Sequence, residues 1–206
     1  MRKALTKLTV VALAICVASP LLAQAEKKKL TAPKKDGAGP AMAAQAPKPD
    51  AEMSQLKLFV GTWSCKGMSP ATSLGPEHPT QATVKATLDY GGFWITGRYE
   101  EAKTGENPMP YKFMFVWGHD AKDKKFYQWS FDVMGGNGRE ESSGWDGDKL
   151  VFNGSMMVMG KPTNARDTFT KKSDTELVHM GEMELDGKWT KVDEETCTKG
   201  GGGAKK

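Results

Sequence analysis

Three side chains of this sequence have the chemistry to form a cross-link or bind a metal ion: Cys65, Cys197 and His179. Two thiols can join in a disulfide, or each can remain separate. A histidine among apolar residues can ligate haem iron or another metal ion, or it can be a structural residue whose ring is hydrogen-bonded within the core. The choice depends on the fold that positions these residues.

The first 25 residues have the pattern of an export signal peptide. Three basic residues precede an apolar run at positions 8–17, and small residues stand at Ala23 and Ala25. The run is shorter than a membrane-spanning helix requires. We therefore predict cleavage near Ala25, with no transmembrane segment in the product, and a final location in the periplasm or outside the cell. Cys16 is removed with this leader.

Composition divides the rest of the chain into a linker, a domain and a tail. Residues 26–50 are rich in Lys, Ala and Pro and contain too few apolar side chains to offset the entropy of ordering, so a disordered linker is predicted. Residues 200–206 are predicted to be a disordered tail for the same reason. Residues 51–199 then form one domain. Residues 52–198 hold 22 acidic and 17 basic side chains, and this charge balance argues against nucleic-acid binding.

The domain is predicted to begin with a short helix and to continue in strands. Asp50 can cap a helix that runs to Phe59, and Gly61 can end it. After Gly61, apolar and polar residues alternate with period two, and Gly, Pro, Asn or Asp bounds each run. Short turns such as Asp186-Gly187 join the runs, and no helix is long enough for a crossover. Consecutive strands should therefore pair antiparallel.

Nine or ten strands joined in this way predict an all-β fold. A meander of that many twisted strands closes more easily than it packs on a second sheet. We predict an antiparallel up-and-down barrel whose end is covered by the helix at 51–59. The aromatic and apolar faces should point inward, and they supply the candidate residues of a ligand cavity: Trp63, Phe113, Phe115, Tyr127, Trp129, Phe131, His179 and Met183.

Barrel closure makes a disulfide between Cys65 and Cys197 the favoured prediction. Closing a meander places the first strand beside the last, and the two cysteines lie in these strands. Export to an oxidising compartment also favours pairing. Cys65 shares the face of Trp63, whereas the strand around Cys197 is too polar to be assigned a face. Two separate thiols remain the alternative, and two thiolates alone would lack the ligands for a metal site.

The other polar residues do not form a catalytic constellation. His119 lies in a predicted turn and His78 in a proline-rich loop. Acidic residues at 140–141 and 193–195 are interpreted as solvent-facing strand positions. Motifs for nucleophilic triads, phosphate loops, CxxC redox sites and zinc proteases are absent. A non-enzymatic protein is therefore favoured.

Four segments carry a resemblance to known barrels. They are LKLFVGTWSCKG (56–67), LDYGGFWITGRYE (88–100), WGHDAKDKKFYQWSFD (117–132) and KWTKVDEETCTK (188–199). The GTW triplet after a short helix resembles the first strand of the calycins, the lipocalin and fatty-acid-binding barrels. The whole pattern is similar to the bacterial domain-of-unknown-function family numbered 1579, a relative of the nitrobindin-like barrels. The resemblance implies a calycin-like barrel of uncharacterised activity.

Three functions follow as hypotheses. A barrel that binds a small hydrophobic ligand predicts a cavity on the order of several hundred cubic ångströms. Resemblance to nitrobindins, which hold haem through one histidine, implies a haem-dependent enzyme with His179 as a weak candidate ligand; the last strand, where such a relative carries its histidine, has none. In the third hypothesis the linker at 26–50 reaches an anionic envelope surface and the domain is structural. Oligomeric state is left open.

Overall fold

Eleven strands follow a short helix in the computed structural model, which describes residues 46–200. The predicted signal peptide, residues 26–45 of the predicted linker and residues 201–206 of the predicted tail lie outside the described residues. The elements are η1 (Ala51–Phe59), β1 (Gly61–Ser69), β2 (His78–Asp89), η2 (Tyr90–Gly92), β3 (Trp94–Glu101), β4 (Lys112–Asp120), β5 (Lys125–Asp132), β6 (Asn137–Ser142), β7 (Trp145–Asp146), β8 (Lys149–Val158), β9 (Lys161–Lys171), β10 (Glu176–Leu185) and β11 (Lys188–Lys199).

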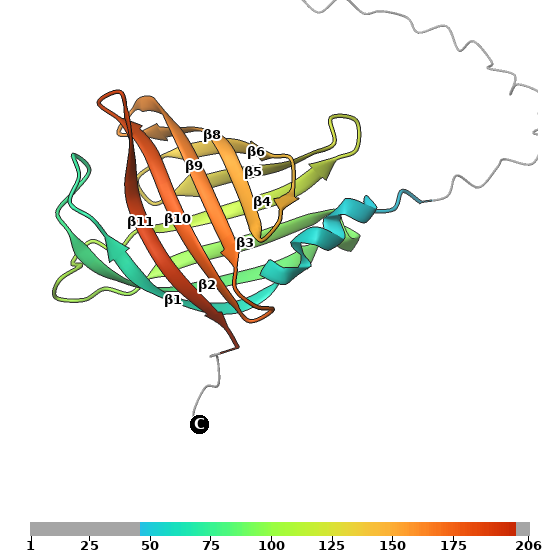
Figure 1. Ribbon diagram of the computed structural model, residues 1–206, viewed down its shortest axis with the longest axis horizontal. Coiled ribbons are helices and arrows are strands. Elements are labelled where there is room, and N and C mark those ends of the chain that lie inside the picture. The colour runs from blue at the N-terminus through green and yellow to red at the C-terminus, as the bar shows by residue number, and fades with distance from the viewer. Residues whose placement is uncertain (1–45, 201–206) are drawn as a thin grey trace, which may run out of the picture. The chain divides into compact units, whose positions relative to one another are not determined.

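The strands form a closed antiparallel barrel (Figure 1). Each strand pairs with the next, except that β6 pairs with β8 and the two-residue strand β7 lies beside β8 as an addition. Pairing of β1 with β11 completes a ring of ten strands. The predicted up-and-down barrel of nine or ten strands is confirmed. The predicted hairpin at Asp186-Gly187 joins β10 to β11, and both residues have the positive φ angles, 50° and 74°, of a two-residue turn.

Two glycines allow close approach where the barrel closes. A Cβ atom on Gly67 of β1 would lie 1.9 Å from the carbonyl oxygen of Glu194 on β11. A Cβ atom on Gly154 of β8 would lie 2.1 Å from the carbonyl oxygen of Arg139 on β6. The β1–β11 pair joins the first strand to the last, and the β6–β8 pair connects the barrel past β7. A side chain at either glycine would push the two paired strands apart.

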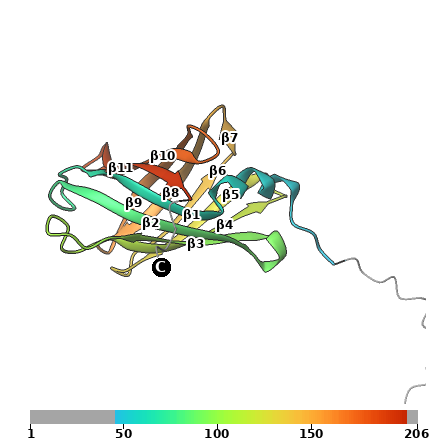
Figure 2. The ribbon, with the colours of Figure 1, turned by 90° about the horizontal axis from the view of Figure 1, so that it is seen from below.

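Helix η1 covers one end of the barrel (Figures 1 and 2). The Asp50 side chain caps it by accepting a hydrogen bond from the Glu52 amide at 3.0 Å, as predicted. Met53, Leu56 and Phe59 are its buried residues. The helix is of the 3-10 type. In the described part of the chain, no helix combines the length and the apolar character needed to span a membrane.

Candidate ligand site inside the barrel

A small cavity inside the barrel is walled mainly by aromatic rings. Its volume is about 70 Å³, against roughly 300–1,000 Å³ for pockets that hold drug-sized ligands. The rings fill most of the interior by packing on one another, as Tyr99 and Phe113 do at 5.0 Å between centroids. The aromatic side chains of the lining are Phe59, Trp63, Tyr99, Phe113, Phe115, Trp117 and Phe169. The cavity is therefore smaller than the sequence led us to expect.

Four of the eight predicted cavity residues belong to this lining: Trp63, Phe113, Phe115 and His179. Trp63 also fixes the helix to the barrel, because its indole N–H donates to the Phe59 carbonyl at 2.9 Å. Met183 lies opposite Ala165 on β9, on the inward row of β10, but it is not part of the lining.

The prediction is wrong for Tyr127, Trp129 and Phe131, which lie on the outer face of β5. Phe131 is 49% exposed. Trp129 packs at 5.9 Å against Trp94, and Tyr127 lies under the Arg139 guanidinium at 4.8 Å. The inward row of β5 is instead Phe126, Gln128 and Ser130, all buried. Alternation does not distinguish this aromatic row from a core row, because aromatic cross-strand pairs also stabilise an outer face.

His179 lies between two aspartates inside the barrel. Its Nε2 atom is 3.0 Å from Asp167 Oδ1, and its Nδ1 atom is 3.6 Å from Asp193 Oδ2. Burial disfavours the charged ring, but the two carboxylates overcome this effect and raise the pKa of His179 to about 9. Burial also disfavours ionised Asp167, yet the hydrogen bond from His179 lowers the pKa of Asp167 below its ordinary value. The two residues therefore form an internal ion pair.

Haem does not fit at His179. Both ring nitrogens face carboxylates, so neither is directed at an iron position. A cavity of about 70 Å³ is also too small for a porphyrin. The contacts of His179 agree with the other alternative, a structural histidine whose ring is hydrogen-bonded within the core.

Several acidic residues point into the barrel, which corrects their interpretation as solvent-facing. Glu140 is 2% exposed and Glu195 is 1% exposed, and the half-buried Asp193 approaches His179. The outward positions are taken by Glu141 and Glu194, whose side chains are 44% and 48% exposed. Alternation holds in these strands, but both faces are polar, so polarity alone could not identify the inward one.

His119 is also buried, although the sequence placed it in a solvent-facing turn. It is the last but one residue of β4, and its side chain is 4% exposed. Its ring packs at 4.8 Å on Phe126, with Nδ1 3.3 Å from Asp50 Oδ2. The contact links the helix cap to the barrel wall.

A glutamine connects two of the internal acids. Gln128 Nε2 donates to Asp167 Oδ2 at 2.8 Å and to Glu140 Oε2 at 3.0 Å. Burial, with the negative charge of Asp167 adding to it, raises the pKa of Glu140 to about 10. Glu140 is therefore protonated at neutral pH and adds no charge to the interior.

Of the two carboxylates in the lining, Glu195 has fewer hydrogen-bond partners than Asp167. Its Oε1 atom accepts from the Tyr99 hydroxyl at 3.0 Å. Its Oε2 atom is buried and has no hydrogen-bond partner within residues 46–200. Burial raises the pKa of Glu195, and the nearby Thr80 hydroxyl opposes this effect without forming an aligned hydrogen bond to Oε2.

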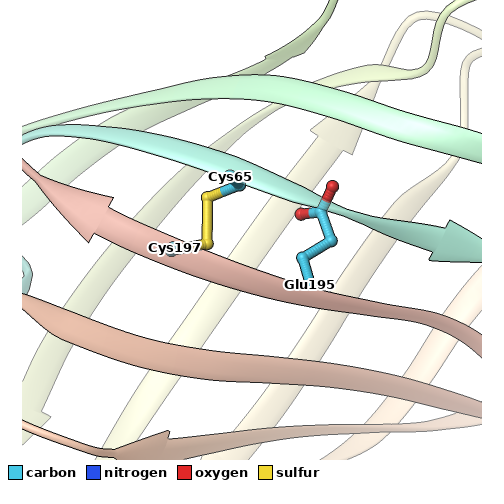
Figure 3. A group of neighbouring side chains, drawn as sticks. All are labelled: Cys65, Glu195 and Cys197. Atoms are coloured by element: carbon cyan, nitrogen blue, oxygen red, sulfur yellow. A yellow bond between two sulfur atoms is a disulfide. The ribbon is translucent and has the colours of Figure 1, made fainter. Parts of the chain in front are cut away.

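The predicted Cys65–Cys197 disulfide forms part of the same wall. The two cysteines are directly opposite each other on β1 and β11, with their Cα atoms 4.0 Å apart. Both side chains face inward and line the cavity, which settles the face that the polar strand had left open for Cys197. Figure 3 shows Glu195 beside the bridge.

Charge in the cavity lining is unbalanced. The lining holds two carboxylates, Asp167 and Glu195, and one cation, His179. His179 forms its ion pairs with Asp167 and Asp193 and acts on Glu195 only through its charge, so Glu195 has no ion-pair partner in the lining. At the end covered by η1, the Lys199 ammonium lies 5.2 Å from the Trp63 ring centre and donates to the Leu58 carbonyl. The wall can thus place a cation against an aromatic ring.

Comparisons with known proteins identify the fold and the family. The crystal structure of Rv2717c from M. tuberculosis is similar with a TM-score of 0.61 and 10% sequence identity, over 74% of this chain and 99% of that chain. A redesigned β-barrel, b11L5F_LGL, matches with a TM-score of 0.38 and 10% identity, over 70% of this chain and 93% of its own. No curated protein matches. The model of a protein family of unknown function, DUF1579, matches residues 48–199, and the chain belongs to this family.

Proposed function

We propose that this barrel is an exported, non-enzymatic protein that binds a small organic cation, an amine with a short apolar body. The observation that supports the proposal is the Glu195 carboxylate, which is buried on an aromatic wall with one oxygen unpartnered and no ion-pair partner in the lining. Leaving a buried acceptor without a partner costs about 1–3 kcal/mol. Burial raises the pKa of Glu195; a ligand ammonium would donate to that oxygen and favour the ionised form of the carboxyl against this effect of burial.

The aromatic lining favours the same class of ligand. An ammonium within about 6 Å of an aromatic ring centre is attracted to the ring face, and the interaction strengthens when the groups are desolvated. The rings also offer an apolar surface to the ligand's body, as expected for a hydrophobic ligand. A fatty acid is disfavoured, because its carboxylate would meet Glu195 and Asp167. The volume of about 70 Å³, against about 30 Å³ per water in the liquid, limits the ligand to a few non-hydrogen atoms.

A pair of matched probes tests the charge requirement. In the oxidised protein, methylamine is expected to bind at least about tenfold more tightly than methanol, because a desolvated charge-assisted hydrogen bond adds more than 1.4 kcal/mol. Two-dimensional NMR, following the Trp63 indole N–H resonance, measures both affinities. Glu195→Gln should remove the difference, whereas Glu194→Gln, a change on the outer face of the same strand, should preserve it. Equal affinities for the two probes would contradict the proposal.

Export is tested by the mass of the protein purified from its own host. Cleavage after Ala25 predicts a chain that begins at Glu26, in the periplasmic or culture fraction. Native mass spectrometry of that material should show an additional small mass that is lost on denaturation. A cytoplasmic chain that retains residues 1–25 would exclude export. A processed chain without additional mass would separate export from ligand binding.

A further inference from the structure

We infer that reduction of the Cys65–Cys197 disulfide turns the cavity wall into a binding site for a divalent metal ion such as Zn²⁺, with the two thiolates and the Glu195 carboxylate as ligands. The inference does not depend on amine binding, which concerns the oxidised protein. The two proposals share Glu195 but describe different redox states.

The three side chains lie close enough together to share one ion after the disulfide is opened. One ligand atom from each of Cys65, Glu195 and Cys197 lies within 4.8 Å of the others. Two sulfurs bound to one tetrahedral zinc ion, each at about 2.3 Å, are about 3.8 Å apart. Glu195 precedes Cys197 by two residues on β11, so both point to the same face, and Cys65 lies opposite Cys197 on β1 (Figure 3). Small shifts of the side chains would bring all three into range of one ion.

Glu195 provides the second, independent indication of a ligand. Glu195 is 1% exposed, and its Oε2 atom has no hydrogen-bond partner among the described residues. Cys65 and Cys197 are 1% and 5% exposed, so an ion held between them would be largely shielded from solvent. Two thiolates alone would leave zinc under-coordinated. The carboxylate supplies the third ligand, and the fourth position faces the cavity, where a water molecule can bind.

The redox step requires a two-electron reductant, such as a dithiol. The dithiol gives two electrons and two protons, the S–S bond breaks, two thiols form on the protein, and the dithiol becomes a disulfide. A phosphine gives the same two thiols, with the protons and the oxygen of its phosphine oxide supplied by one water molecule. Binding of the metal ion then releases the thiol protons, because the ligands are thiolates. Reoxidation would expel the ion, since a sulfur engaged in the disulfide is no longer a thiolate. His179, opposite Glu195 on β10, stays with its two aspartates and is not counted as a ligand.

Cobalt is the probe for this site. The full chain is reduced with tris(2-carboxyethyl)phosphine without oxygen and is titrated with Co²⁺. We expect a thiolate-to-cobalt charge-transfer band and intense visible bands of tetrahedral cobalt, both saturating at one ion per chain, and both lost when Zn²⁺ is added. The oxidised protein should give neither band. Circular dichroism of the same samples reports whether the reduced barrel remains folded.

Matched variants assign the ligands. Cys65→Ala should abolish the charge-transfer band of the tetrahedral site. Glu195→Gln should weaken cobalt binding at least about tenfold, the minimum effect expected even for groups outside the ligand shell, and Glu194→Gln should leave it unchanged. Three results would overturn the inference: no charge-transfer band in the reduced wild type, equal affinity in Glu195→Gln, or loss of the β-sheet signal on reduction. None of them bears on amine binding, which is measured without reductant.

Discussion

Replacing Cys65 and Cys197 together with alanine is expected to lower the free energy of unfolding by about 5 kcal/mol, the chain-entropy value for a closed loop of this length. The two cysteines are separated by 132 residues, so the disulfide restricts almost the whole domain in its unfolded state. The bridge also joins β1 to β11, the pair that closes the ring. A loss of this size is a large fraction of the 5–15 kcal/mol that typically stabilises a domain.

Chemical denaturation of the oxidised wild type, the reduced wild type and the double variant measures this effect. The reduced wild type should match the double variant more closely than it matches the oxidised protein, because both lack the cross-link. Alanine suits the comparison, since both positions are buried in the cavity wall and serine would add a hydroxyl there. A difference below about 1 kcal/mol between the oxidised wild type and the variant would show that the unfolded chain keeps β1 and β11 together without the bridge.

The barrel itself could be predicted because its signals are local. Alternation in residues 81–90 and the Asp186-Gly187 turn require no knowledge of distant contacts, and they agree with β2 and with the β10–β11 hairpin. The disulfide followed from topology, since closure makes the first and last strands neighbours, and from the expected export to an oxidising compartment. The N-cap of η1 at Asp50 could likewise be predicted from the sequence.

The interior of the barrel was predicted less well, because period two assigns two faces without saying which is inside. In β5 the aromatic row of Tyr127, Trp129 and Phe131 lies outside, and Gln128 lies inside as a donor to two buried acids. Such a glutamine is favourable only because Asp167 and Glu140 arrive from β9 and β6. That dependence on two other strands, one of them distant in the sequence, cannot be read from β5.

The polar last strand shows which signal could have been used. Cys197 faces inward once the disulfide is accepted, and residues two and four positions before it must then share its face. This reasoning places Glu195 and Asp193 inside. It identifies the unpartnered carboxylate and one neighbour of His179, but the partner from β9 still requires the three-dimensional structure.

The stability of the barrel is expected to fall as pH rises from 6.5 to 9. His179 has an ordinary pKa of 6.5, and its pKa in the barrel is about 9. Below pH 6.5 the folded and unfolded states are both protonated, and the stabilisation from the Asp167 and Asp193 contacts is fully present. Above pH 6.5 the unfolded state loses its proton while the folded state keeps it. Stability then decreases by about 1.4 kcal/mol per pH unit, or about 3 kcal/mol in all, until the folded state also titrates.

Glu140 acts in the same direction. Its pKa is raised from 4.5 to about 10, so the folded state holds a proton that the unfolded state loses above pH 4.5. Asp167 acts at the acidic end: its pKa is lowered, so its contribution is present above pH 3.8 and is lost as pH falls through the lower folded value. Together with His179, these groups predict a stability maximum at about pH 4, above the range in which the Asp167 contribution is lost and below the range in which Glu140 and then His179 lower the stability.

Chemical denaturation at a series of pH values between 6 and 9.5 tests the assignment. His179→Gln should be less stable than wild type at pH 6 and should show a shallower decline, because the group that titrates between 6.5 and 9 is gone. Glu140→Gln in the same background should flatten the curve further. His78→Gln is the matched control, since the His78 ring bonds to the Pro76 carbonyl and approaches no internal aspartate. A wild-type stability that is constant or increasing across this range would show that His179 is neutral in the barrel, and the internal ion pair would then be refuted.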